Sequence, residues 1–197
     1  MAVTITTTSA EADLAGILAL QRANLRLNLP TDVATEQGFV TLQYTLDQMR
    51  KMHQAGPSVI AKDGDTVVGY VITTLPETRQ FVPELANLFS QIDTLTYHNR
   101  PLPTYTYYIA GQVCVADGYC GLQLLYRMHR HHRSLYNDSF QLLITDIFAL
   151  NPAPLAFTNV STFRFCSVST SQRWAKRAYI WTYSHLESKS ALTTSSK

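Results

Sequence analysis

The stretch from Tyr105 to Asn137 constrains the fold more than any other part of the sequence, because it reads as a strand, a turn and a helix in succession. Residues 105–115 carry no charge and are rich in aromatic and β-branched side chains, which is typical of a strand buried on both faces. Residues 117–121 then interrupt this pattern with two glycines. The following apolar stripe has the spacing of a helix and consists of Leu124, Leu125, Met128, His132 and Leu135.

The turn at residues 117–121 is a candidate anion site. A glycine-containing turn that leads into a helix presents unpaired backbone N–H groups and the positive end of the helix dipole, so a pyrophosphate could bind there. The same succession of elements occurs in many folds that bind no ligand at this place. The pattern alone therefore leaves a purely structural turn as an equal alternative.

Composition and charge narrow the class of protein. The chain has 197 residues, of which 46% are hydrophobic and 15% are charged, and its formal net charge is +2. This length fits one domain with its own core, which we place at residues 1–186, and we expect the Ser/Thr/Lys-rich residues 187–197 to form a flexible tail. The small net charge gives no reason to expect nucleic acid or an anionic membrane as a partner.

The cysteines and the N-terminus favour a cytoplasmic protein. Three cysteines, Cys114, Cys120 and Cys166, cannot all pair within one chain. The N-terminus shows no basic segment followed by an apolar core, which is the pattern of a secretory leader. We therefore expect reduced thiols in a cytoplasmic protein. The longest charge-free run, residues 147–163, contains two prolines and two asparagines and does not resemble a membrane span.

The rest of the chain supplies further strands and helices. Before Tyr105, the sequence predicts a strand, two helices, a hairpin and a third helix at residues 3–7, 8–28, 42–52, 58–74 and 83–95. Thr8 and Glu11 have the spacing of a capping box, and Asp63-Gly64 is a dipeptide that favours a hairpin turn. After Asn137, it predicts a strand, a short helix and two strands at residues 141–147, 155–160, 163–168 and 179–183.

This order of elements predicts an α/β fold with a mixed sheet. Ligands of such sheets bind beyond the carboxyl ends of the strands, at a point where the packing of the strands changes. The turn after Val115 follows the strongest strand of the sequence. We therefore expect the functional site to lie at this turn.

The order of elements and several segments together resemble the GNAT superfamily of N-acetyltransferases, which transfer an acetyl group from acetyl-CoA to an amine. The likeness is to one bacterial branch of the superfamily, and it extends along almost the whole chain. It implies a mixed, mostly antiparallel central sheet flanked by helices, with the acyl-CoA site at a splayed pair of strands. The segments that carry it are Ile17-Leu18-Ala19-Leu20-Gln21, Gln37-Gly38-Phe39-Val40-Thr41, Val67-Val68-Gly69-Tyr70 and Gly111-Gln112-Val113-Cys114-Val115.

The resemblance also implies which residues bind acetyl-CoA, the expected co-substrate. Backbone groups of Val113 and Val115 would hold the pantetheine arm, and the turn that follows would hold the pyrophosphate. The implied cofactor-binding residues are Val113, Cys114, Val115, Tyr119, Cys120, Gly121, Leu122, Gln123, Leu124 and Asn151.

The chain departs from the family pattern at several of its positions. Cys120 stands where this branch has an arginine, and Gln123 stands where a second small residue would let the backbone approach the phosphates. Farther along, Pro152 to Pro154 replaces a polar trio, and Thr158 stands where a donor would protonate the leaving thiolate. A GNAT-fold protein that has lost catalysis and serves as a CoA-binding, ligand-binding or regulatory module is therefore the alternative to an N-acetyltransferase.

Two side chains are candidates for catalysis. Transfer to an amine requires an uncharged nucleophile, a polarised carbonyl and a proton for the thiolate. Asp146, alone or through a water that it orders, is the candidate base, and a structural carboxylate at the strand end is the alternative interpretation. Tyr108 is a candidate for a catalytic side chain in the cleft, as is its neighbour Tyr107, and core packing is the alternative for each.

The partners follow from the same reasoning. Residues 127–133 contain three arginines and three histidines, which we interpret as a solvated helix face. The alternative is that Arg127 or Arg130 neutralises phosphates of CoA. We expect no metal there, because no cysteine or acid nearby completes a set of ligands. The acceptor is expected to be a small-molecule or peptide amine, and the protein a monomer or homodimer.

Overall fold

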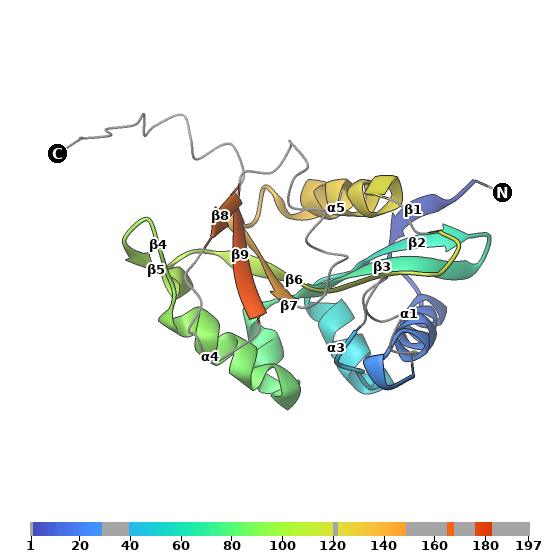
Figure 1. Cartoon of the computed structure of the whole chain (residues 1–197), viewed down its shortest axis with the longest axis horizontal. Helices are drawn as coiled ribbons and strands as arrows, with labels where there is room; N and C mark the ends of the chain where they lie inside the picture. Colours follow the sequence, from blue (N-terminus) through green and yellow to red (C-terminus); the bar gives the residue numbers. More distant parts are fainter. Residues whose placement is uncertain (1, 29–39, 120–121, 149–164, 168–175, 183–197) are drawn as a thin grey trace.

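A seven-stranded mixed sheet is the middle layer of the fold, and helices cover both of its faces (Figure 1). The structure is a computed structural model that describes residues 2–28, 40–119, 122–148, 165–167 and 176–182. The strand order is β1-β2-β3-β6-β7-β9-β8. These strands are β1 (Thr4–Thr7), β2 (Val59–Asp63), β3 (Thr66–Thr74), β6 (Tyr107–Val115), β7 (Leu142–Phe148), β8 (Phe165–Ser167) and β9 (Lys176–Thr182).

Strand direction confirms the predicted mixed, mostly antiparallel sheet. β6 and β7 run parallel to each other, and every other neighbouring pair of the seven strands is antiparallel. A crossover connection is needed to join parallel neighbours, and α5 (Leu122–Tyr136) provides it. The strand, turn and helix of residues 105–137 are thus the β6–α5 unit at the centre of the molecule.

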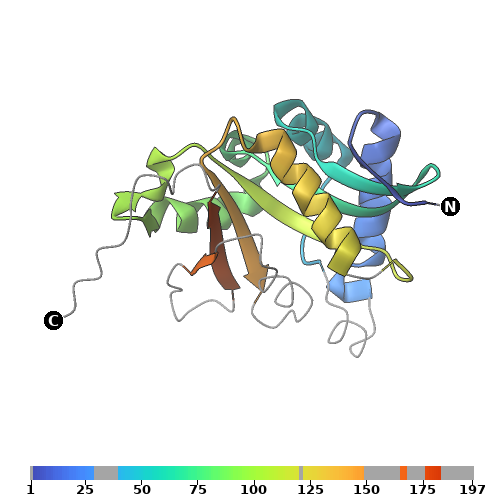
Figure 2. The same ribbon diagram turned by 90° about the horizontal axis from the view of Figure 1, so that it is seen from above.

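The helices divide the core into two clusters. α5 covers one face of the sheet, whereas α1 (Glu11–Ala23), α3 (Leu46–Ala55) and α4 (Ala86–Thr94) cover the other (Figure 1). Figure 2 shows α5 lying obliquely across the strands. No helix in the described part of the chain has the length and apolar character that crossing a membrane requires.

The start of α1 differs from the prediction. Thr8 and Glu11 do not form a capping box; instead the Asp13 carboxylate accepts hydrogen bonds from the backbone N–H groups of Ser9 (2.9 Å) and Ala10 (3.2 Å). The Thr8 hydroxyl is used elsewhere, because it accepts a bond from the backbone N–H of Ser58 (3.1 Å). The helix also ends at Ala23 rather than near residue 28, where the chain continues as a short 3-10 helix, η1 (Arg26–Asn28).

α3, the second predicted helix, begins four residues later than predicted, at Leu46 instead of Leu42. Thr45 and Gln48 form the capping box that starts it, with each side chain bonded to the other's backbone N–H (3.2 Å and 2.8 Å). Residues before Thr45 are therefore outside the helix. Met49 and Met52 are buried as predicted.

The predicted hairpin is confirmed as β2 and β3, with Gly64 at a positive φ of 58° in its turn. After β3 the chain leaves the sheet for residues 75–106. This excursion packs α4 beneath the sheet through Phe89 and Ile92. It also contains three 3-10 helices and a small hairpin, namely η2 (Pro76–Gln80), η3 (Pro83–Leu85), η4 (Leu102–Thr104), β4 (Thr96–Tyr97) and β5 (Arg100–Pro101).

α5 is present as predicted, but its buried residues differ in part from the predicted stripe, because Leu125 is only half-buried and Leu135 is exposed. Leu124, Met128 and His132 are buried, and the stripe continues to Tyr136. Leu135 was expected to point inward, yet 38% of it is exposed. These four buried residues follow one another at intervals of four; His129 is buried beside this row, and Leu135 lies outside it.

The last strands confirm the predicted run 141–147 and the two predicted strands after it, as β7, β8 and β9. The predicted short helix at residues 155–160 and the tail at residues 187–197 lie outside the described residues.

Candidate active site

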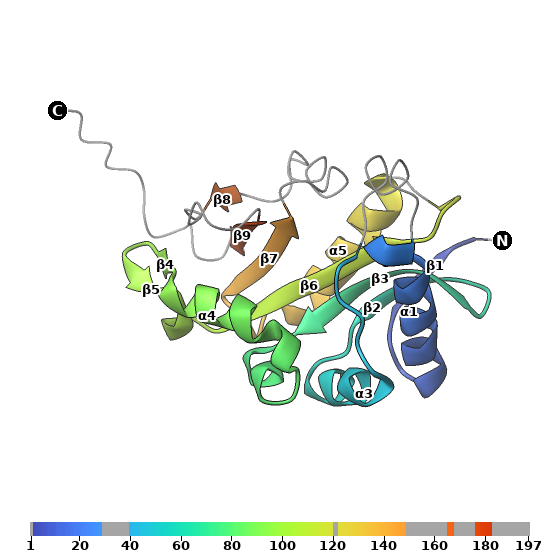
Figure 3. The ribbon, with the colours of Figure 1, turned by 60° about the horizontal axis from the view of Figure 1, so that its bottom comes forward.

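The parallel strands β6 and β7 separate toward their carboxyl ends. They are paired from Tyr107–Leu142 to Ala110–Thr145, and the register stops there although each strand continues (Figure 3). β6 remains paired with β3 as far as Val115, and β7 with β9 as far as Phe148. The two strands thus form a V. Its side on β6 consists of residues 111–115, which we call the arm.

A β-bulge lies where the V begins. The register of β3 with β6 shifts between Ile72–Gln112 and Thr73–Ala110, so Gly111 is an extra residue on β6. A Cβ atom on Gly111 would lie 2.6 Å from the Thr74 hydroxyl oxygen, which explains the glycine. Bulges bend a strand locally, and this one lies at the last residues that β6 shares with β7.

Exposure changes at the same place. Residues 107–110 of β6 are buried, whereas residues 111–115 are half-buried. The prediction of a strand buried on both faces is therefore right for the first half only. The half-buried arm is accessible to a ligand.

The backbone of the arm is oriented toward the V. The N–H of Ala116 donates to the carbonyl oxygen of Val68 on β3 (2.8 Å). Because successive residues of a strand direct their N–H and C=O groups to opposite sides, those of Val113 and Val115 point away from β3. They therefore point to the side from which β7 has departed, as the predicted contact with a pantetheine arm requires.

The turn after β6 is held by its own backbone. The N–H of Tyr119 donates to the carbonyl oxygen of Ala116 (3.1 Å), and Gly118 between them has a positive φ of 79°. This is the geometry of a type II turn, which requires glycine at this position. α5 begins at Leu122, and the first N–H groups of a helix have no partner within it. The turn and the helix start therefore provide donors for an anion at the end of the arm.

The structure brings most of the predicted cofactor-binding residues to this arm and turn. Val113 and Val115 face α5, and Cys114 faces α1 and α3. Gln123 is exposed in the first turn of α5, whereas the Leu124 side chain is buried, so only its backbone could face a ligand. Cys120, Gly121 and Asn151 lie outside the described residues, as does the side chain of Leu122.

The two candidate catalytic side chains are placed differently. Tyr108 is completely buried beneath α5, and its ring packs against His132, Tyr136 and Phe140, with centroids 5.1, 4.9 and 5.2 Å away. This environment is that of a core residue. Tyr107 is also buried, on the other face, where its hydroxyl accepts a 3.4 Å bond from Arg79.

Asp146 is the residue of β7 directly after the last pair with β6. Its backbone therefore lies at the base of the V, as a base in this site requires. Its side chain is outside what the structure describes.

The basic residues of α5 are not all solvated. Arg130 is exposed, but His129 and His132 are buried. Arg127 donates a hydrogen bond to the backbone carbonyl of Val3 (3.0 Å), the residue before β1. β1 is an edge strand of the sheet, and three strands separate it from β7. The Arg127 guanidinium is therefore occupied away from the V. Within the described residues, no group of three or more His, Cys, Asp or Glu could hold a metal ion.

A network of side-chain amides that the sequence analysis did not predict lies on the α1 face of the arm, where Gln21 is buried and Gln112 is half-buried. The side-chain Oε1 of Gln112 accepts hydrogen bonds from Gln21 Nε2 (2.6 Å) and from the Tyr70 hydroxyl (2.8 Å). Gln112 Nε2 donates to the Leu42 carbonyl (2.8 Å), and Gln21 Oε1 accepts from the Tyr44 N–H (2.9 Å). Residues 42–44 are thereby fixed against the open half of β6.

The network joins three of the four segments that carry the family resemblance. Gln21 ends the first, Tyr70 ends the third, and Gln112 lies in the fourth. Burial raises the pKa of Tyr70 well above its usual value, with a smaller contribution from Cys114, so its hydroxyl remains a donor. The pattern within each segment does not indicate these hydrogen bonds, because they form only when the fold brings the segments together.

The chain has the fold of the GNAT N-acetyltransferases. It is similar to a mosquito arylalkylamine N-acetyltransferase-like protein at 12% identity and a TM-score of 0.56, covering 92% of this chain and 100% of that one. A GNAT-family acetyltransferase from Streptococcus agalactiae gives 12% identity, a TM-score of 0.56 and coverage of 92% and 95%.

A putative acetyltransferase from Salmonella typhimurium, solved with its cofactor acetyl-CoA, is 14% identical, with a TM-score of 0.52 and coverage of 99% and 100%. No protein-family model matches this chain, and no curated protein matches it in sequence. At these identities the comparisons establish the fold, which confirms the architecture expected from the resemblance.

Proposed function

We propose that this protein binds acetyl-CoA in the V between β6 and β7 and transfers the acetyl group directly to an amine. The observation that carries the proposal is the half-buried arm of β6, whose Val113 and Val115 backbone groups face the V and which leads into the start of α5. A pantetheine arm needs backbone partners along its length, and a pyrophosphate needs N–H donors at its end. The arm and the turn offer these in the required order.

The chemistry assigned to the chain's own groups is limited to positioning and proton transfer. The amine nitrogen attacks the thioester carbonyl carbon, the C–S bond breaks, and the leaving sulfur takes up a proton. A backbone N–H of the arm would polarise the carbonyl, and Asp146 would accept the proton that the amine loses. The acceptor, a small-molecule or peptide amine, would enter on the α1 face, where residues 42–44 border the open half of β6.

A second function is favoured by one specific observation. Of the two candidate catalytic side chains, Tyr108 is a buried core residue, which leaves Asp146 alone. A GNAT-fold module that binds CoA or another ligand without catalysis needs the V but no catalytic side chain. Turnover therefore separates this function from the first, whereas binding alone does not.

Calorimetric titration with acetyl-CoA and with free CoA tests the proposal directly. Micromolar binding, equivalent to about −8 kcal/mol, would support it and justify screening amines for turnover. The absence of detectable heat, together with no thermal stabilisation at millimolar ligand, would reject CoA as a ligand.

We expect Gln123→Gly to tighten CoA binding. The Gln123 side chain is exposed in the first turn of α5, where it would crowd the approach of a pyrophosphate to the helix N–H groups. Calorimetry of both proteins measures the difference. Gln54→Gly, which replaces an exposed glutamine of α3 instead of α5, is the matched control. Equal or weaker binding by Gln123→Gly would contradict the crowding argument.

We expect Asp146→Asn to lower turnover by roughly 10²-fold or more with little change in acetyl-CoA affinity, because the amide cannot accept the proton. Thiol release from acetyl-CoA in the presence of a panel of amines measures turnover. Asp138→Asn, at an exposed position just after α5, controls for the loss of a carboxylate. Equal losses of turnover and affinity in Asp146→Asn would instead indicate a structural role.

A further inference from the structure

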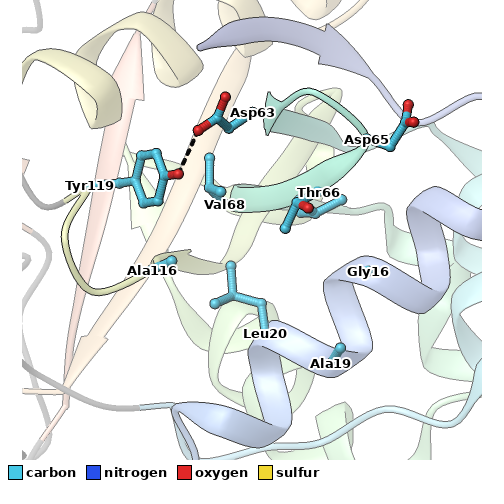
Figure 4. A pocket seen from close by; sticks show the side chains of 10 residues that line it. Gly16, Ala19, Leu20, Asp63, Asp65, Thr66, Val68, Ala116 and Tyr119 are labelled. Atoms are coloured by element: carbon cyan, nitrogen blue, oxygen red, sulfur yellow. Dashed lines mark hydrogen bonds between the residues drawn. The ribbon is translucent and has the colours of Figure 1, made fainter. Parts of the chain in front are cut away.

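The turn that follows β6 is attached to the far end of the β2–β3 hairpin by one side chain. The Tyr119 hydroxyl donates a hydrogen bond of 2.6 Å to the carboxylate of Asp63, the last residue of β2 (Figure 4). The two residues are 56 positions apart in the sequence. The bond thus links the turn to a part of the sheet that is remote along the chain.

This contact fixes the end of the turn, as the backbone fixes its beginning. Ala116 is bonded to Val68 of β3, and the Tyr119 N–H returns to Ala116. α5 begins three residues after Tyr119, at Leu122. A rotation of the turn about Ala116 is therefore opposed by the bond from Tyr119 to Asp63.

The ring of Tyr119 points toward Asp63 of the hairpin (Figure 4). It forms part of a hollow of about 460 Å³ between α1, the hairpin and the turn, together with Leu20, Val68 and Ala116 (Figure 4). Asp63 and Asp65 lie on the rim of this hollow. Two carboxylates make the hollow a poor place for phosphates, so we place the pyrophosphate at the start of α5 rather than in this hollow.

The chemistry of the bond suits a fixed anchor. A hydroxyl that donates to a carboxylate forms a shorter and stronger hydrogen bond than a neutral pair. The bond to Asp63 also raises the pKa of Tyr119, so the phenol remains a donor at neutral pH. Asp63 is paired with Thr66 of β3, and its neighbour Lys62 is paired with both β1 and β3, so the carboxylate is attached to backbone that the sheet holds.

We propose that Tyr119 is a positioning residue that holds residues 116–119 through Asp63, and thereby positions the end of β6 for the phosphates of CoA. The inference rests on the proposed function. It adds that the hydrogen bond from the Tyr119 hydroxyl to Asp63 holds this segment in place, a role for Tyr119 distinct from contact with the ligand.

The test compares Tyr119→Phe with the wild type in calorimetric titrations with CoA. We expect a dissociation constant about fivefold higher, because the ring remains while the anchoring bond is lost. Pantetheine, which lacks the pyrophosphate, is titrated by ligand-observed NMR and should bind both proteins equally. Equal losses for the two ligands would show general damage to the site and overturn the proposal, as would unchanged CoA affinity.

Two hairpin variants provide the matched control. Asp63→Ala removes the acceptor of the bond, whereas Asp65→Ala removes a carboxylate from the same rim that makes no bond to Tyr119. We expect Asp63→Ala to weaken CoA binding and Asp65→Ala to leave it unchanged or tighter. The double variant Tyr119→Phe/Asp63→Ala should bind no more weakly than the weaker single variant, because both remove one bond. Additive losses would overturn the proposal.

The outcome for the wild type separates the two levels of inference. A wild-type protein that binds no CoA overturns the proposed function and this inference together. A wild-type protein that binds CoA, with a Tyr119→Phe variant that binds equally well, overturns only the positioning role.

Discussion

Replacing Tyr108 by alanine is expected to destabilise the protein by about 3–5 kcal/mol, the range measured when a large aromatic side chain is removed from a core. Tyr108 is completely buried beneath α5, and three rings surround it, those of His132, Tyr136 and Phe140. Truncation would leave a cavity in the middle of this cluster and remove aromatic contacts worth about 1 kcal/mol each. Urea unfolding followed by circular dichroism measures the loss. Since a small domain has only about 5–15 kcal/mol of stability, a large unfolded fraction could result.

The variant Tyr108→Phe distinguishes packing from catalysis at the same position. It keeps the ring and removes the hydroxyl, so a packing role predicts a loss of only about 1–2 kcal/mol with CoA affinity and turnover retained. A catalytic acid would show the reverse, with normal stability and turnover reduced by roughly 10²-fold. Tyr126→Ala, at a half-buried position of α5, provides the control and should cost less than Tyr108→Ala.

The reason that sequence alone could not settle the role of Tyr108 is the bulge at Gly111. Along a regular strand, alternate residues share a face, so Tyr108 and Cys114 would lie on the same side. The extra residue reverses this parity: Tyr108 and Val113 lie on the α5 face of the sheet, whereas Tyr107 and Cys114 lie on the face that α1, α3 and α4 cover. No residue of the sequence reports a bulge by itself, because a glycine in a strand has several possible causes.

Local signals were more reliable than those that depend on contact between distant segments. The hairpin at Asp63-Gly64 was predicted because its turn requires a positive φ, which is a property of two adjacent residues. The start of α1 was predicted wrongly, since Thr8 bonds to Ser58, a residue 50 positions away, and Asp13 caps the helix in its place. The same limit applies to the Gln21, Tyr70 and Gln112 network and to the Tyr119–Asp63 bond. Each depends on tertiary contacts that the pattern of one segment does not contain.

The protein is expected to lose stability steeply as the pH falls below about 6.5, because α5 buries two neutral histidines. His129 is 8% exposed and His132 is fully buried. Burial lowers the pKa of His129 to about 4, and it lowers that of His132 well below the usual value, with further contributions from His129 and His131. In the unfolded chain both imidazoles return to a pKa of about 6.5.

The sign follows from the protons bound in each state. Between pH 6.5 and pH 4 the unfolded chain takes up a proton at His129 while the folded chain does not, so acid favours unfolding. For the pKa of His129, the loss between pH 7 and pH 5 is about 2 kcal/mol. His132 acts in the same direction. Its Nε2 is bonded to the Thr73 hydroxyl (2.8 Å), and among the described residues its Nδ1 has no partner that could stabilise an added proton.

Urea unfolding at pH 7 and pH 5 measures this loss, and substitutions assign it. His129→Leu cannot take up a proton, so the difference in unfolding free energy between the two pH values should shrink by about 2 kcal/mol, whatever the variant's stability at pH 7. His131→Gln, at a half-exposed position of the same helix, should retain almost the whole difference. An unchanged difference in His129→Leu would mean that His129 is protonated as readily in the folded protein as in the unfolded chain. Acid sensitivity would then have to come from His132 and the carboxylates, and the buried face of α5 would have to admit water at His129.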